Sequence, residues 1–196
     1  MGQRSLIFKK DSQISRICIR IVVVYGRLRS EGAMTNTESA KSKVCVETHE
    51  AFALESVLVN TLISHLGAET SPFGNMAIAP EFYYQTGRAD LVGIGEDNSV
   101  IAFEAKLEKW RTAVHQAFRN TSFADYSFVV LPAKIARRAM ASEGEFERRK
   151  VGLISVTPCG FEILIEHKTE RVLRPRLREK AVQFITETRS AEPPST

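Results

Sequence analysis

The sequence has few of the residues that build metal centres and disulfide frameworks. Its 196 residues include three cysteines and four histidines, with no C-x-x-C pair and no histidines spaced to complete a zinc site. This pattern argues against the common structural zinc modules, and a reducing compartment fits it best. We therefore expect a cytoplasmic protein in which Cys18, Cys45 and Cys159 are packing residues.

Long apolar runs and two common catalytic motifs are also missing. Arg16 and Arg20 interrupt the stretch "ISRICIRIVVVYG" and leave "IVVVY", far short of the roughly 20 residues that a membrane helix needs. The sequence contains no G-x-S-x-G or G-x-x-x-x-G-K motif, which argues against a serine hydrolase and an NTPase. We therefore expect no membrane partner and a different kind of chemistry.

Positive charge is concentrated at one end of the chain. The net charge is +4, but residues 1–33 hold seven basic and two acidic residues, so this segment carries +5 and the remainder about −1. We expect residues 1–43 to be a basic extension and flexible lead-in, with Met34 as the functional start. A nucleic-acid surface on the remainder must then be a local patch, for which "AKIARRAMASEGEFERRK" is one candidate.

Hydrophobic periodicity predicts one α/β domain over residues 44–188, followed by a disordered tail over 189–196. Helices and strands alternate, which favours a central mixed β-sheet flanked by helices. The turn "GEDNS" predicts a hairpin between the second and third strands, and "TPCG" predicts another at the end of the sheet. In chain order we expect a helix over 48–67 capped by Thr48, strands over 76–84, 88–95 and 100–107, a helix over 109–120, a strand over 124–132, a helix over 133–141, strands over 151–156 and 161–168, and a helix over 176–188.

The third predicted strand carries an acid and a base on one face. Side chains alternate across a strand, so Glu104 and Lys106 of "VIAFEAKL" point the same way. The hairpin around "GEDNS" brings Asp90 of the preceding strand beside them. Two converging carboxylates repel one another and usually require a cation between them; Mg²⁺ suits such oxygen ligands. A neighbouring lysine can steady an attacking water or developing negative charge.

The E-x-K spacing alone is weak support, because the chain contains a second one. Glu166 and Lys168 have the same spacing at the end of another predicted strand. No acid on a hairpin neighbour is placed beside this second triplet as Asp90 is placed beside the first. The candidate site is therefore the one at Asp90, Glu104 and Lys106.

These residues resemble the PD-(D/E)XK, or restriction-endonuclease-like, nuclease superfamily. The resemblance covers residues 48–132: "GRADLVG" with Asp90, "FEAKL" with Glu104 and Lys106, then the helix "KWRTAVHQAFRN" and the strand "ADYSFVVLP". It implies a restriction-endonuclease-like αβββαβ core, here with an added C-terminal β-hairpin and helix. It also implies Asp90 and Glu104 as ligands of Mg²⁺, with Mn²⁺ as a substitute, and Lys106 as the residue that serves the attacking water.

Two more residues extend the resemblance, and two positions depart from it. The family places an acid of the first helix near the metal, and Glu55 is the candidate. Gln116 lies at the margin of the buried stripe of its helix, where it can face the site. Some exonuclease-like branches have Tyr four residues after this Gln, but here the residue is Asn120. Ala89 stands where many members have proline.

The leading expectation is a metal-dependent nuclease that acts on nucleic acid, with DNA as the expected partner. Such a compact nuclease often needs a second subunit to embrace a duplex, so a homodimer is an open alternative to a monomer. The alternative from another class is the same fold without the chemistry, a catalytically idle module that binds nucleic acid or a protein. Metal binding through Asp90 and Glu104 separates the two.

Overall fold

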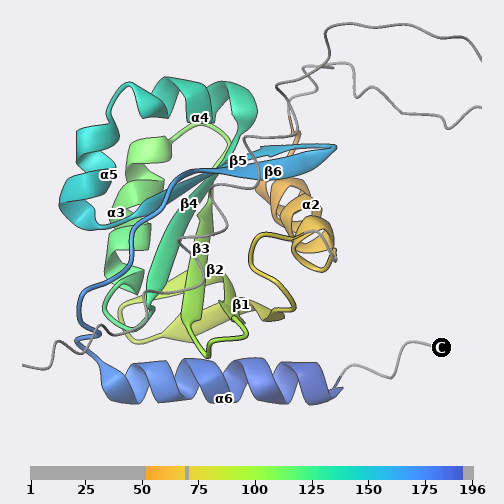
Figure 1. Ribbon diagram of the computed structural model, residues 1–196, viewed down its shortest axis with the longest axis vertical. Coiled ribbons are helices and arrows are strands. Elements are labelled where there is room, and N and C mark those ends of the chain that lie inside the picture. Colours follow the sequence, from red (N-terminus) through yellow and green to blue (C-terminus); the bar gives the residue numbers. More distant parts are fainter. Residues whose placement is uncertain (1–51, 69–70, 192–196) are drawn as a thin grey trace, which may run out of the picture. The chain divides into compact units, whose positions relative to one another are not determined.

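A computed structural model describes residues 52–68 and 71–191 (Figure 1). They form a six-stranded mixed sheet in the order β1-β2-β3-β4-β5-β6, flanked by helices. The predicted α/β class and central mixed sheet are confirmed. The elements are α2 (Glu55–Leu66), β1 (Ala77–Tyr84), β2 (Gly87–Ile94), β3 (Val100–Ala105), α3 (Trp110–Asn120), β4 (Tyr126–Pro132), α4 (Ala133–Met140), α5 (Glu143–Arg149), β5 (Gly152–Thr157), β6 (Gly160–Ile165) and α6 (Pro175–Ala191).

Strand direction follows the length of each connection. β1, β2 and β3 pair antiparallel through short turns, and β5 and β6 form a second antiparallel hairpin. β3, β4 and β5 are parallel, because α3 and then α4 with α5 carry the chain back across the sheet between them. Both predicted hairpins are confirmed.

One face of the sheet is covered by α3 to α6. Around β4 and β5, α3, α4 and α5 bury Val129, Leu131 and Leu153. Around β1 to β3, α6 buries Val92 and Ala102, which are direct strand partners. Glu104 belongs to this face, because it lies two residues after Ala102 on the same strand.

The opposite face is covered by α2, which contacts β3, β5 and β6. Figure 1 shows α2 and α3 on opposite sides of the sheet. The ring of Phe73 packs edge-on against Phe103 and Phe128. The sheet is therefore buried on both faces, and Glu104 must occupy an interior position.

The first helix begins later than predicted. Leu54 is extended and precedes α2, which begins at Glu55. Leu58, Leu62 and Leu66 are its buried stripe, whereas Leu54 and Val57 are exposed. The apolar spacing that predicts the helix therefore includes two residues, Leu54 and Val57, that lie on the surface. Thr48, Met34, Cys18, Cys45 and the predicted 1–43 extension lie outside the described residues.

Further differences concern charged segments and element ends. The sequence did not predict α5, because its run of Glu and Arg hides the buried Phe146, which stacks on Trp110 at 5.8 Å. α6 runs to Ala191, three residues into the predicted tail, and Ser190 hydroxyl donates to the Thr186 carbonyl in its last turn. Cys159 is exposed in the β5–β6 turn and disulfide-bonded, so its predicted packing role is wrong. In the described ranges, no helix combines the length and apolar character needed to cross a membrane.

Candidate active site

Asp90 and Glu104 lie opposite one another where the β2–β3 ladder ends. The last strand partners at this end are Leu91 and Phe103, so Asp90 and Glu104 occupy the next facing positions. Asp90 Oδ2 accepts a hydrogen bond from the backbone N–H of Ala105 at 3.0 Å. The Asp90 carboxylate thus accepts the hydrogen bond that the backbone carbonyl of a neighbouring strand would accept in a continued ladder.

The neighbouring strand is irregular at the same level. Pro80 of β1, which has no N–H to donate, pairs with Leu91. Glu81 then has φ of 55°, a left-handed conformation that costs free energy in a residue other than glycine. Ala79 and Phe82 both pack in the α6 cluster, although residues three positions apart on a regular strand point to opposite faces. The strands therefore bend here, and this bend accompanies the end of the ladder at Asp90.

Glu104 is a buried carboxylate with one oxygen held and one left over. The residue is 1% exposed, and Oε1 accepts a hydrogen bond from Asn120 Nδ2 at 2.7 Å. Oε2 is buried without a hydrogen-bond partner in the described part of the chain. Burial, and secondly the charge of Asp90, raise the pKa of Glu104 to about 8; the Asn120 hydrogen bond and Lys106 oppose this rise.

Lys106 connects this site to the helix on the other face. Its Nζ donates to Glu55 Oε2 at 2.8 Å and to the Ala105 carbonyl at 2.9 Å. The Lys106 side chain is 18% exposed and that of Glu55 is 47% exposed. The sequence predicts Lys106 within the third strand, but β3 ends at Ala105, so Lys106 directly follows the strand. The fold nevertheless keeps the ammonium close enough to Glu104 to oppose the rise in its pKa.

Among the described residues, no hydrogen bond joins Gln116 to Asp90, Glu104, Lys106 or Glu55. It is half-buried on α3, and its Oε1 is buried without a hydrogen-bond partner among the described residues. It lies one helical turn before Asn120, on the same side of α3. The structure thus brings Asp90, Glu104, Lys106 and Glu55 together by direct contact or charge, and places Gln116 one turn from the residue that holds Glu104.

Asn120 and Tyr84 are site residues that the sequence reasoning missed. Asn120 is fully buried, and its Oδ1 accepts a hydrogen bond from Tyr84 Oη at 2.6 Å while Nδ2 donates to Glu104. Burial, and then the charge of Glu104, raise the pKa of Tyr84. The sequence feature that could have identified Asn120 is its position on the buried stripe of α3, where it follows Ala113 and Ala117 at helical spacing and is the one polar residue.

The second E-x-K triplet lies outside a strand. β6 ends at Ile165, one residue before Glu166. Lys168 forms an isolated bridge with Tyr126, and its ammonium lies 5.5 Å from the centre of that ring. The two triplets are therefore in different structural settings.

The donors at the first site fit a hard cation that keeps part of its water. Asp90 and Glu104 supply carboxylate oxygens, and the unpartnered Glu104 Oε2 is a buried acceptor of the kind that Mg²⁺ binds. Glu55 was predicted as a third ligand, but its carboxylate is paired with Lys106. Over residues 52–68 and 71–191, no three Asp, Glu, His or Cys side chains gather as a metal cluster. Asp90 and Glu104 therefore remain as the two candidate ligands at this site.

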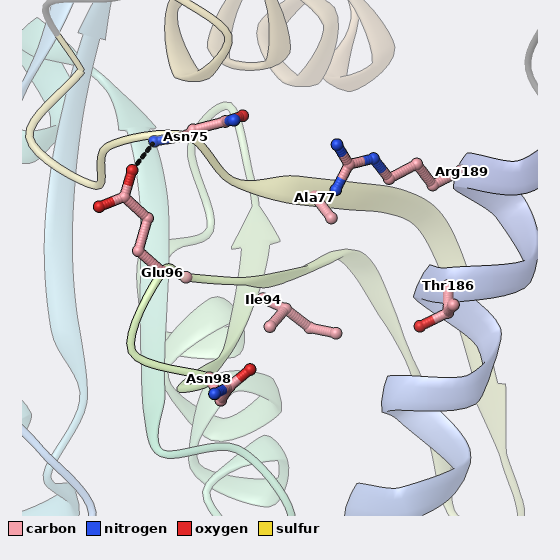
Figure 2. A pocket seen from close by; sticks show the side chains of 8 residues that line it. Asn75, Ala77, Ile94, Glu96, Asn98, Thr186 and Arg189 are labelled. Atoms are coloured by element: carbon pink, nitrogen blue, oxygen red, sulfur yellow. Dashed lines mark hydrogen bonds between the residues drawn. The ribbon is translucent and has the colours of Figure 1, made fainter.

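Two hollows lie away from this site. One has a volume of about 300 Å³ and lies between α6 and the start of β1, the end of β2 and the β2–β3 turn, with Arg189 in its lining. Figure 2 also shows the Glu96 carboxylate accepting the Asn75 N–H. The other, about 420 Å³, lies beside the end of α2. Neither is lined by Asp90, Glu104 or Lys106. The candidate active site is therefore distinct from both hollows.

Comparisons with known proteins bear on the fold alone. Protein-family models give no match, and neither do curated proteins. Among solved structures, the chain is similar to the SPO1766 protein of unknown function from Silicibacter pomeroyi, with a TM-score of 0.51 and 17% identity. The similarity covers 68% of this chain and 84% of the other. It supports the mixed α/β fold.

Replacing Asn120 with Ala is expected to lower the free energy of unfolding by about 1–3 kcal/mol, because it leaves Glu104 Oε1 and Tyr84 Oη without their buried partner. Urea unfolding measures the loss. Tyr84→Phe, which removes one of the two hydrogen bonds, should cost less. Gln183→Ala on the exposed side of α6 is the matched amide control. Equal losses for Asn120→Ala and Gln183→Ala would contradict the structural role of Asn120.

Proposed function

We propose that this chain is a metal-dependent nuclease with a PD-(D/E)XK-like site that hydrolyses nucleic-acid phosphodiester bonds. In this proposal α2, β1–β3, α3 and β4 are a restriction-endonuclease-like αβββαβ core, and β5, β6 and α6 are additions. The observation that carries the proposal is the buried Glu104. Its carboxyl group faces Asp90, and one of its oxygens has no hydrogen-bond partner among residues 52–68 and 71–191. The charge of Lys106 also acts on it.

Each residue has a distinct role in this mechanism. Asp90 and Glu104 would hold the metal, and Asn120 keeps Glu104 Oε1 engaged so that Oε2 stays available. Mg²⁺, or Mn²⁺ as a substitute, supplies Lewis-acid stabilisation of the phosphoryl group when bound. The Lys106 ammonium would orient the attacking water and offset charge that develops on the phosphate oxygens.

Glu55 and Gln116 have supporting roles in the proposal. The Glu55 carboxylate holds the Lys106 ammonium at 2.8 Å, which restricts where that cation can lie. Gln116 carries a buried amide oxygen, one turn from Asn120, that has no hydrogen-bond partner within the described ranges. The partner is nucleic acid, with DNA as the first candidate, and the setting is the cytoplasm. A second copy of the chain would let this compact domain embrace a duplex.

A cleavage assay tests the proposed function. The purified full-length chain is incubated with single-stranded, double-stranded and branched DNA and RNA, in Mg²⁺, in Mn²⁺ and in EDTA. We expect cleavage that requires the metal and stops in EDTA. Absence of cleavage on every substrate with both metals would count against a nuclease.

One observation favours the alternative, a catalytically idle module that binds nucleic acid or a protein. Both Asp90 oxygens already have partners, since Oδ1 accepts from Arg88 at 3.2 Å and Oδ2 from the Ala105 N–H. A metal would have to compete with Arg88. Isothermal titration calorimetry with Mn²⁺ separates the two functions. A nuclease binds the metal through Asp90 and Glu104, whereas an idle module does not.

A further inference from the structure

Two exposed arginines beside the candidate site differ from the other cations near it. Arg88 pairs with Glu81 at 3.0 Å and with Asp90 at 3.2 Å, and Lys106 pairs with Glu55. For Arg119 and Arg174, in contrast, no carboxylate of the described residues lies within salt-bridge distance. Both side chains are exposed, and within the described part of the chain their charges are not neutralised by a carboxylate.

Both arginines are close enough to the site to change its electrostatics. Arg119, in the last turn of α3, directly precedes Asn120 and opposes the rise in the pKa of Glu104. Arg119 and Arg174 both oppose the rise in the pKa of Tyr84. Two hydrogen bonds, through Asn120, connect Tyr84 to Glu104. Arg119 is the sequence neighbour of Asn120, and Arg174 donates a hydrogen bond to Thr86, two residues after Tyr84, so both cations lie beside this hydrogen-bonded chain.

The backbone holds Arg174 beside the end of α3. Its N–H donates to the Ser122 carbonyl at 2.8 Å, which ties the segment before α6 to the turn that follows α3. Its Nη1 lies 3.4 Å from Thr86 Oγ1, in the β1–β2 turn. Arg119 and Arg174 therefore come from separate segments but are placed together by the fold.

The α4–α5 basic run, which the sequence suggested as a phosphate surface, is less suited to the task. In α5 its two arginines follow Glu143, Glu145 and Glu147, so both signs of charge are present. Arg149 donates to the Glu145 carbonyl, and Arg111 pairs with the Glu145 carboxylate.

We infer that Arg119 and Arg174 bind backbone phosphates of the nucleic acid whose scissile bond lies at Asp90 and Glu104. This inference rests on the proposed nuclease function. Guanidinium forks match phosphate oxygens, and phosphate contacts fix the register of a strand without reading its sequence. The arginines hold the strand beside the site while Asp90, Glu104 and Lys106 act on it.

Salt dependence of binding tests this inference. Binding of a fluorescent DNA strand to the full chain is measured in EDTA, which prevents cleavage, at several salt concentrations. Each lost phosphate contact is expected to reduce the slope of log affinity against log salt by about 0.7–0.9. We expect this reduction for Arg119→Ala and for Arg174→Ala, roughly twice as much in the double variant, and little change in Arg119→Lys or Arg174→Lys, which keep the charge.

Arg189→Ala is the matched control, because it removes one exposed arginine about 20 Å further along α6. In cleavage assays the double Ala variant should raise KM about 10-fold or more with kcat within about 2-fold, as expected for lost uniform binding, and should bind Mn²⁺ as wild type does. Unchanged salt slopes in both Ala variants overturn the inference, even if the wild-type chain cleaves. Binding with altered slopes but no cleavage confirms the phosphate contacts of the two arginines but counts against the nuclease, and with it against a scissile bond at Asp90 and Glu104. A chain that neither binds nor cleaves overturns both.

Discussion

Asp90→Asn and Lys106→Ala should each reduce metal-dependent cleavage by on the order of 100-fold or more while leaving the protein folded. Asn at position 90 keeps an oxygen that can accept the Ala105 N–H but removes the charge that a cation requires. Ala at position 106 removes the ammonium that opposes the rise in the pKa of Glu104. Single-turnover cleavage with saturating Mn²⁺ measures both losses.

The two variants should differ in metal binding. Asp90→Asn should weaken Mn²⁺ affinity, whereas Lys106→Ala should leave it equal or tighter, because a neighbouring cation is removed. The lost Lys106–Glu55 pair is partly exposed and should cost no more than about 1 kcal/mol of unfolding free energy. Lys180→Ala, on the exposed side of α6, is the matched lysine control. Near wild-type cleavage by Lys106→Ala would remove Lys106 from the mechanism.

Glu104 should make the protein less stable as pH rises in the absence of metal. Its pKa is about 8 in the folded protein against an ordinary value of 4.5. Between these pH values the folded protein holds a proton that the unfolded chain has lost, so this contribution to stability is full below about pH 4.5 and lost as pH passes 8. The free energy of unfolding should fall by up to about 1.4 kcal/mol per pH unit across that window.

Glu104→Gln isolates this effect, because a neutral amide replaces the carboxyl group with little change in shape. Urea unfolding at pH 5.5, 7 and 8.5 should show a smaller loss of stability with pH in the variant than in the wild type. Mn²⁺ should stabilise the wild type more at pH 8.5 than at pH 5.5 and should not stabilise the variant in this way. Glu108→Gln, an exposed neighbour after β3, is the control. Identical pH dependence in wild type and Glu104→Gln would contradict the buried, proton-holding carboxyl group.

The sequence was sufficient for the parts of the site that depend on local pairing. Short turns and alternating strands predicted the β2–β3 hairpin, and a hairpin centred on "GEDNS" necessarily places Asp90 across from Glu104. The helix after β3 followed from the change of period at Trp110. These inferences needed only neighbours in the chain, which is why the order of elements was predictable.

Contacts between distant segments were not predictable in the same way. The approach of Glu55 to Lys106 depends on how α2 packs on the far face of the sheet, and the Tyr84–Asn120 hydrogen bond joins residues 36 apart in sequence. Asn120 was visible as a polar residue in an apolar stripe, but its partner could not be identified from spacing alone. The left-handed conformation of Glu81 could not be predicted from the sequence, because the residue at that position is not glycine.

The hydrogen bond from the Ala105 amide to Asp90 has a spectroscopic consequence. The Ala105 amide proton is hydrogen-bonded to the Asp90 carboxylate, so its chemical shift should change when that carboxylate binds a cation. In a ¹⁵N-labelled protein, the Ala105 amide resonance should therefore shift when a diamagnetic cation such as Mg²⁺ is added, and its solvent exchange should slow if the carboxylate is held more firmly. This one resonance would report occupancy of the site directly, with no nucleic acid present and no bond cleaved.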